Sequence, residues 1–171
     1  LKMEIDDLWL SDITYIPTRE GWLYLAAVLD AYSRALVGWA MSRTLDTKLA
    51  MDALTMAIAH RGPPVTLHSD QGSTYATGSY REIVNRYGIR QSMSRKGDCW
   101  DNAPMESFFH TLKTELVMHC DYKTRDDARA SLFDYMEVFY NRQRRHSSIS
   151  YEAPLPFEAM KSPGKVSTVR G

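Results

Sequence analysis

Three acidic residues stand at positions from which their carboxylates could act together. Asp12 is at the centre of residues 8–16, a run of aromatic and β-branched residues that predicts a strand. Asp70 directly follows a short apolar run, and Glu106 lies just inside a predicted helix. A carboxylate inside a sheet is costly unless it is paired or binds a metal. Asp12 is therefore either a satisfied structural acid or part of a metal site, and the other two acids favour the metal site.

Converging carboxylates predict chemistry that depends on divalent metal ions. Such groups repel one another and raise each other's pKa unless cations neutralise them. Hard ions with oxygen ligands, Mg²⁺ or Mn²⁺, suit this set of donors. Two ions about 3.5–4 Å apart clamp the attacking and leaving oxygens of a phosphoryl displacement. No Gly-rich phosphate loop is present, which argues against a nucleoside triphosphate enzyme.

The elements that must position these acids follow from the pattern of apolar residues. Three predicted strands joined by short turns form an antiparallel meander, and two further short strands alternate with helices. The predicted strands are residues 8–16, 22–29, 35–41, 65–68 and 89–92. This order predicts an α/β fold with a five-stranded mixed sheet flanked by helices. If the first and fourth strands are neighbours, Asp12 and Asp70 meet at one edge, and the helix after Asn102 brings Glu106 there.

Composition sets further bounds. At 171 residues, with 44% apolar and 25% charged residues, the chain suits one soluble globular domain. No apolar run approaches the roughly 20 residues of a membrane span. Cys99 and Cys120 form no Cys-x-x-Cys pair, so a zinc site or disulfide framework is not expected, and a reducing cytoplasm fits. Residues 1–150 are predicted to form the catalytic core, and the proline-containing residues 151–171 an irregular C-terminal tail.

Positive charge is local rather than general. The net charge is zero, but residues 80–97 carry five basic residues and one acidic residue, including Arg95 and Lys96. A second basic cluster holds Arg142, Arg144 and Arg145. Runs of charge are more often solvated faces than binding sites, so both interpretations stay open from charge alone.

Several stretches, in order and with matching spacing, resemble the catalytic core of bacterial insertion-sequence transposases. The resemblance is closest to the third (IS-three) family, whose transposase is made from two overlapping reading frames and is related to retroviral integrases. The family's acidic triad has thirty-five residues between its second Asp and its Glu, as here between Asp70 and Glu106. Lys113, seven residues after Glu106, matches a Lys or Arg of the family. The matching stretches are residues 9–15, 68–75, 92–109 and 140–147. Residues 153–158 depart from the family pattern.

The resemblance implies a ribonuclease H-like fold and a DNA transposase. Asp12 and Asp70 would hold one Mg²⁺ or Mn²⁺, and Glu106 would complete a second site with Asp12. Cleavage of the transposon end would free a 3′-OH, which would then attack target DNA in strand transfer. Lys113 would contact the end DNA beside the cut. Further DNA contacts are expected from the basic residues Arg95, Lys96, Arg142, Arg144 and Arg145.

The resemblance also sets expectations for assembly and location. We expect a homodimer or larger oligomer in the DNA complex, acting in the bacterial cytoplasm at the nucleoid. Because the chain starts at Leu1 rather than Met, we expect a fragment whose upstream helix-turn-helix part is missing. Two rival hypotheses remain: a nuclease of the same fold that only hydrolyses, and a catalytically silent DNA-binding or assembly module.

Overall fold

A five-stranded mixed sheet forms the centre of the molecule. The computed structural model describes residues 2–70, 72–93 and 102–161. The strand order is β3-β2-β1-β4-β5, with antiparallel pairing among β1, β2 and β3 and parallel pairing of β1 with β4 and of β4 with β5. The sheet predicted from the sequence is therefore confirmed. The strands are β1 (Leu8–Thr18), β2 (Gly21–Asp30), β3 (Leu36–Ser42), β4 (Thr66–Ser69) and β5 (Arg90–Met93).

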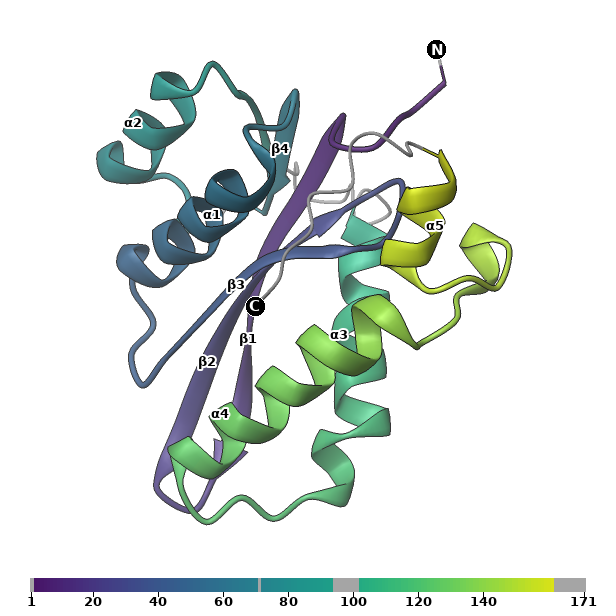
Figure 1. Ribbon diagram of the computed structural model, residues 1–171. Coiled ribbons are helices and arrows are strands. Elements are labelled where there is room, and N and C mark those ends of the chain that lie inside the picture. The colour runs from purple at the N-terminus through teal and green to yellow at the C-terminus, as the bar shows by residue number, and fades with distance from the viewer. Residues whose placement is uncertain (1, 71, 94–101, 162–171) are drawn as a thin grey trace.

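Helices cover both faces of the sheet (Figure 1). One face carries α1 and α2, and the other carries α3 and α4, so the molecule has three layers. The helices are α1 (Thr47–Arg61), α2 (Gly78–Arg86), α3 (Ala103–Glu115), α4 (Arg125–Asp134) and α5 (Pro154–Lys161). Shorter helical turns are η2 (Val117–His119), η3 (Tyr135–Tyr140) and η4 (Ser147–Ile149). Within the described residues no helix is long and apolar enough to cross a membrane.

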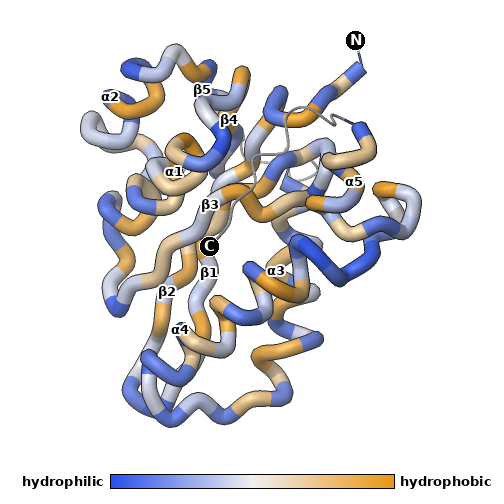
Figure 2. Tube along the Cα trace, viewed as in Figure 1, coloured by the Kyte–Doolittle hydropathy of each residue, from blue (hydrophilic) through white to orange (hydrophobic). Residues whose placement is uncertain are grey.

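Strand β1 supplies apolar side chains to both cores, as alternation along a strand requires. Leu10 and Ile16 pack in the core beneath α3 and α4, while Trp9 packs in the core beneath α1 and α2. Helix α1 lies so close to β3 that a Cβ at Gly38 would come 2.4 Å from the Ala53 carbonyl oxygen. Figure 2 shows a hydrophilic stretch between the end of η3 and α5, outside these cores.

The register of the last long helix differs from the one that its sequence predicts. Helical spacing places Phe139 on the same buried face as Ala128 and Leu132. In the structure Phe139 is exposed and Tyr140 is buried instead. Residues Tyr135–Tyr140 form a π-helix, whose wider turn moves the buried position one residue along the chain.

The prediction of an irregular C-terminal tail is wrong for residues 154–161, which form α5. Proline disrupts the interior of a helix, but Pro154 and Pro156 both lie in the first turn of α5, where backbone N–H groups have no partner to lose. Phe157 and Glu158 are buried, and the Phe157 ring lies 5.5 Å from that of Tyr32. Residues 162–171 lie outside the described residues.

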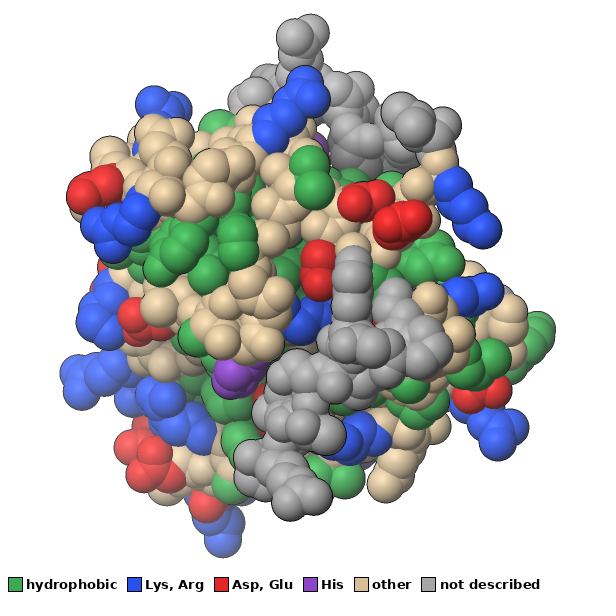
Figure 3. All heavy atoms as spheres, turned by 45° about the horizontal axis from the view of Figure 1, so that its top comes forward, with side chains coloured by type: hydrophobic (Ala, Val, Ile, Leu, Met, Phe, Trp, Pro, Cys, Tyr) green, Lys and Arg blue, Asp and Glu red, His purple; other side chains and the backbone are tan. Residues whose placement is uncertain are grey.

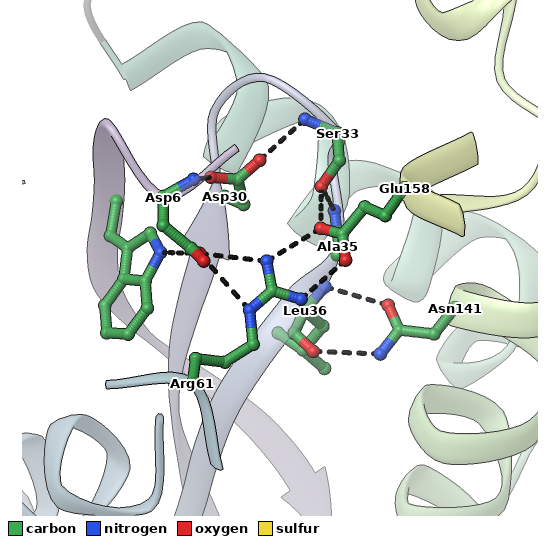
Figure 4. A network of polar contacts seen from close by, with 9 residues as sticks. Asp6, Asp30, Ser33, Ala35, Leu36, Arg61, Asn141 and Glu158 are labelled. Atoms are coloured by element: carbon green, nitrogen blue, oxygen red, sulfur yellow. Dashed lines mark hydrogen bonds and ion pairs between the residues drawn. The ribbon is translucent and has the colours of Figure 1, made fainter. Parts of the chain in front are cut away.

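A buried polar network fastens α5 to the sheet (Figure 4). Arg61, at the end of α1, donates to Glu158 through Nη1 (2.6 Å) and Nη2 (2.8 Å) and to Asp6 Oδ1 through Nη2 (2.9 Å). Ser33 Oγ also donates to Glu158. Asp30, a fully buried residue, accepts from the Asp6 and Ser33 amides. The N-terminal segment, the β2–β3 turn, α1 and α5 thus meet at one point.

Candidate active site

Parallel strand pairing places Asp12 beside Asp70. Ser11 on β1 is the register partner of Ser69 on β4, and each serine directly precedes one of the aspartates. Asp12 Oδ1 accepts from the Ile13 amide at 2.8 Å, and Asp70 Oδ1 accepts from the Gly72 amide at 2.8 Å. A Cβ at Gly72 would lie 2.8 Å from that Asp70 oxygen, so a larger residue there would displace the Asp70 carboxylate. The backbone therefore holds Asp12, on β1, beside the carboxyl end of β4, where Asp70 lies.

Glu106 comes from a different layer of the structure. It lies in the first turn of α3 and is exposed. Met105, Phe108 and Leu112 anchor the buried side of the same helix in the core beneath the sheet. Because the helix is held from that side, Glu106 stays on the surface while its charge still acts on Asp12.

Electrostatics couples the three acids. The pKa of Asp12 is raised from its ordinary value of 3.8 to about 6, mainly by burial and further by the negative charges of Asp70 and Glu106, against the opposing effect of the Ile13 amide. Among the described residues no three His, Cys, Asp or Glu side chains are arranged to hold a metal ion. The acids are thus close enough to repel, without surrounding one point. An all-carboxylate set of donors under mutual repulsion fits a hard divalent cation.

This shift predicts how stability depends on pH in a metal-free buffer. The pKa of Asp12 is about 6 in the folded protein and 3.8 in the unfolded chain, so the fold favours the protonated carboxyl group. This contribution to stability is fully present below pH 3.8 and is lost as the pH rises through 6. Asp12→Asn should therefore gain on the order of 3 kcal/mol over the wild type between pH 4 and pH 7. Urea unfolding in EDTA at both pH values measures this gain. A stability difference that does not change with pH would contradict the prediction.

A layer of buried hydroxyl groups supports the two aspartates from the opposite side of the sheet. Ser11 and Ser69 are both buried, and Ser11 Oγ donates to the Tyr75 hydroxyl at 3.3 Å. The Tyr75 ring packs edge-on against Tyr80 at 5.2 Å. Sequence reasoning missed this layer, although a serine before each aspartate was a visible signal.

Lys113 lies two helical turns after Glu106, beside β1. Its Nζ is 5.2 Å from the centre of the Tyr15 ring, which packs edge-on against Trp22 at 4.8 Å. Both aromatic side chains are about half exposed. The ammonium group is thus held by a cation–π contact at the surface, three residues along β1 from Asp12.

The predicted basic DNA contacts have different surroundings. Arg144 forms an ion pair with Glu115 at 2.7 Å, and Glu115 also accepts from the Tyr135 hydroxyl, so Arg144 braces the end of α3. Arg142 and Arg145 are exposed. Arg95 and Lys96 lie outside the described residues. On the end of the molecule shown in Figure 3, Lys and Arg side chains are scattered around the rim rather than gathered in one patch.

Two other residues of the motif at 140–147 hold the fold together. The Asn141 side-chain amide accepts from the Leu36 amide and donates to the Leu36 carbonyl, both at 2.8 Å. The Tyr140 ring packs edge-on against Phe108 on α3 and against His146. Part of this motif therefore joins β3 and α3 to the last helices, a role that its basic composition concealed.

Comparison with known proteins agrees with this geometry. Residues 4–99 match the family described as integrase core domain, and a second family of the same description matches residues 87–154. The chain is 45% identical over 157 residues to "Transposase for insertion sequence element IS904" of Lactococcus lactis, covering 91% of this chain and 62% of that protein. It is 47% identical over 152 residues to "Transposase InsF for insertion sequence IS3A" of Escherichia coli, covering 88% and 53%. The chain thus spans a little over half the length of the curated relatives it matches.

Solved structures share the fold. The HTLV-2 integrase catalytic core domain, determined in complex with magnesium in a trimeric form, matches with a TM-score of 0.69 at 16% identity, covering 90% of this chain and 96% of that one. A chain of a simian T-cell lymphotropic virus intasome matches with a TM-score of 0.66 at 20% identity, covering 78% and 49%. The predicted ribonuclease H-like fold is confirmed. The chain belongs to the integrase core domain family, with bacterial insertion-sequence transposases among its relatives.

Proposed function

We propose that this chain is the catalytic core of an insertion-sequence transposase that cuts transposon ends and joins them to target DNA. The observation that carries the proposal is the electrostatic coupling of the three acids. Two neighbouring parallel strands hold Asp12 beside Asp70, and the pKa of Asp12 is raised mainly by burial and further by the charges of Asp70 and of Glu106 on α3. The names of the relatives and the match to the integrase core domain family support the same function.

Each acidic residue has a role in this proposal. Asp12 and Asp70 would jointly hold one Mg²⁺ or Mn²⁺, and Glu106 with Asp12 would hold a second. When bound, two such ions would neutralise the carboxylates and stabilise the charge that develops on phosphate oxygens during in-line displacement. In the first step water attacks the phosphodiester at the transposon end and the 3′-OH leaves. In the second step that 3′-OH attacks a target phosphodiester, which releases a target 3′-OH.

Assembly on two ends follows from this reaction, because joining both transposon ends needs two active sites acting together. Closed twofold dimers are the commonest oligomers, so a homodimer or larger assembly on paired ends is part of the proposal. An upstream helix-turn-helix part would supply end recognition. The core itself would bind DNA mostly through phosphates. The site of action would be the bacterial nucleoid.

A strand-transfer assay tests the proposal against its rivals. Labelled transposon-end duplexes with a free 3′-OH, incubated with a plasmid target and Mg²⁺ or Mn²⁺, should become covalently joined to the plasmid. A nuclease that only hydrolyses would shorten the labelled ends without joining them. A silent module would bind DNA and leave all strands intact, and either of these results would refute the proposal.

Lys113→Ala should weaken binding of the transposon end and lower strand transfer, because the ammonium group would contact phosphate or a terminal base beside the cut. Loss of one phosphate contact should reduce the slope of log affinity against log salt by about 1. Lys113→Arg should retain most of the binding. Lys123→Ala, which removes an exposed charge before α4, is the matched control. Fluorescence anisotropy measures binding, and equal results for the two alanine variants would leave Lys113 as a solvated helix residue.

A further inference from the structure

We propose that a pocket on the flank of α3 away from the catalytic acids binds a phosphodiester group of the bound DNA, with the half-buried Arg34 as its anchor. This proposal rests on the proposed function, because it takes DNA as the substrate. It adds a binding site outside the acidic triad, and it gives a role to an arginine that no sequence motif singled out.

The pocket is a defined cavity of about 660 Å³ between α3 and the chain around η4. Helix α3 contributes its first residues together with the hydroxyl groups of Ser107 and Thr111. Ser107 and Thr111 are one turn apart on one flank of α3, whereas Glu106 and Lys113 lie on another flank. The other lining side chains come from the β2–β3 turn, from the last residue of η3 and from the segment that follows it: Arg34, Tyr140, Arg144, Arg145, His146, Ser148 and Tyr151.

Arg34 lines this pocket with one nitrogen of its guanidinium group unpaired. Its Nη1 atom is buried and has no hydrogen-bond partner among the described residues. Its backbone adopts the left-handed conformation with φ +66°, which is uncommon for a residue other than glycine. A buried guanidinium nitrogen without an acceptor is costly. The arrangement is explained if an anion supplies the missing acceptor.

The side chains that line the pocket carry a net positive charge, although Asp30, outside the lining, also acts electrostatically on Arg34. Arg34, Arg144 and Arg145 line the pocket, and no Asp or Glu is among the described lining residues. The pKa of His146 is lowered to about 4, mainly by burial and further by the positive charges of Arg144 and Arg34. These two arginine charges therefore act on the inside of the pocket. The His146 Nε2 atom is also buried without a described partner. Arg144 is already paired with Glu115, so Arg34 and Arg145 are the cations left to bind a ligand.

A DNA phosphodiester fits this set of groups better than a protein carboxylate. Guanidinium groups with hydroxyl donors around them form the usual setting of a backbone phosphate. The pocket also shares α3 with Glu106, and a helix is about 10–12 Å across. A strand whose scissile phosphate lies at the catalytic acids can therefore cross α3 and place a phosphate two or more nucleotides away in the pocket.

DNA binding without divalent metal tests the proposal separately from catalysis. The affinity of wild type and Arg34→Gln for a short duplex is measured by anisotropy between 50 and 200 mM salt. Arg34→Gln should bind about five- to tenfold more weakly at 0.1 M salt, with a salt slope smaller by about 1. Arg34→Lys should recover part of the affinity. Lys48→Gln, which removes an exposed charge from α1 on the other face of the sheet, should change neither quantity.

Neutral methylphosphonate links placed one at a time along the strand then locate the contact. A methylphosphonate at one position should weaken DNA binding by the wild type. The same methylphosphonate should not weaken binding by Arg34→Gln, because the DNA change and the protein change remove the same contact in a double-mutant cycle. If Arg34→Gln does not fold, Arg145→Gln replaces it in the same cycle. Failure of strand transfer with this cycle intact would refute the proposed reaction and leave the pocket standing.

Three outcomes would overturn the assignment. Unchanged DNA affinity and salt slope in both arginine variants would exclude a phosphodiester contact. A second measurement is the thermal stability of each protein with inorganic phosphate. If phosphate stabilises the wild type, and the arginine variants lose this stabilisation but bind DNA unchanged, the pocket is a site for free anions only. Unchanged DNA binding together with a change of oligomeric state in light scattering would show that the pocket takes an acidic group of another protein chain.

Discussion

Replacing Asp12, Asp70 or Glu106 by alanine is expected to abolish end cleavage and strand transfer together, each rate falling by at least about 10³-fold. Each substitution removes a carboxylate that would hold a divalent ion, and stabilisation of developing charge by such ions is worth several kcal/mol. Gel assays of both steps in Mg²⁺ and in Mn²⁺ measure the loss. Activity retained by any single variant would remove that residue from the mechanism.

Controls separate lost chemistry from lost folding and lost binding. Asp12→Asn, Asp70→Asn and Glu106→Gln keep the side-chain shape, so they should fold and should bind DNA without metal like the wild type. Lys113→Ala has the complementary profile, with weaker end binding and intact metal binding. Isothermal titration with Mn²⁺ should show weakened binding in the acid variants only. If the acid variants lost DNA affinity but kept Mn²⁺ binding, the carboxylates would have a role other than holding metal.

Arg61→Met is expected to lower the free energy of unfolding by about 3–5 kcal/mol, the typical effect of breaking a buried ion pair by removing one partner. The Arg61 and Glu158 side chains are only 14% and 8% exposed, so the change removes the cationic partner of the Glu158 carboxyl group in a poorly hydrated place. Asp6 loses the same partner. Urea unfolding at pH 7 measures the difference.

Two comparisons test this explanation. Arg86→Gln breaks the exposed pair with Glu82, whose side chains are 62% and 71% exposed, and should cost less than about 1 kcal/mol. Adding Glu158→Met to Arg61→Met should recover part of the loss, because removing both charges leaves neither ion unpaired. A double variant no more stable than Arg61→Met would show that packing, rather than charge, dominates at this point.

The sheet and the candidate site were predictable where local pattern and tertiary structure agree. Alternating and continuous apolar runs gave all five strands within about two residues of their observed ends, the usual uncertainty of element boundaries. An aspartate directly before an apolar stripe at helical spacing predicts a helix cap at Asp46. In the structure Asp46 caps α1 and accepts from the Leu49 amide. Asp12 and Asp70 could be predicted to lie together because Asp70 follows β4 directly, and Asp12 is on β1, the parallel neighbour of β4.

Other features depend on contacts that no short window of sequence contains. Ser79 and Glu82 form a capping-box pattern, which predicts a helix from residue 80. The helix begins two residues earlier, and Thr77 caps it. The π-helical turn that exposes Phe139 has no periodic signal. Helix α5 depends on the ion pair between Glu158 and Arg61, ninety-seven residues apart in the chain. Arg34 lies in the turn between β2 and β3, and the rest of its pocket comes from residues 103–151, so no local sequence pattern marks it as a binding residue.

The network that fastens α5 has a consequence for synthesis on the ribosome. Asp6 and Arg61 are made early, but Glu158 emerges about 150 residues after Asp6, roughly 8–30 s later at ordinary elongation rates. Strands β1 and β4 can pair in that interval, while Arg61 waits for its main partner and the β2–β3 turn stays uncovered. In a nascent chain Asp12 and Asp70 would thus lie side by side for many seconds before α5 packs onto the domain. Translation pausing between residues 61 and 158 would prolong that vulnerable interval and raise the demand for chaperones.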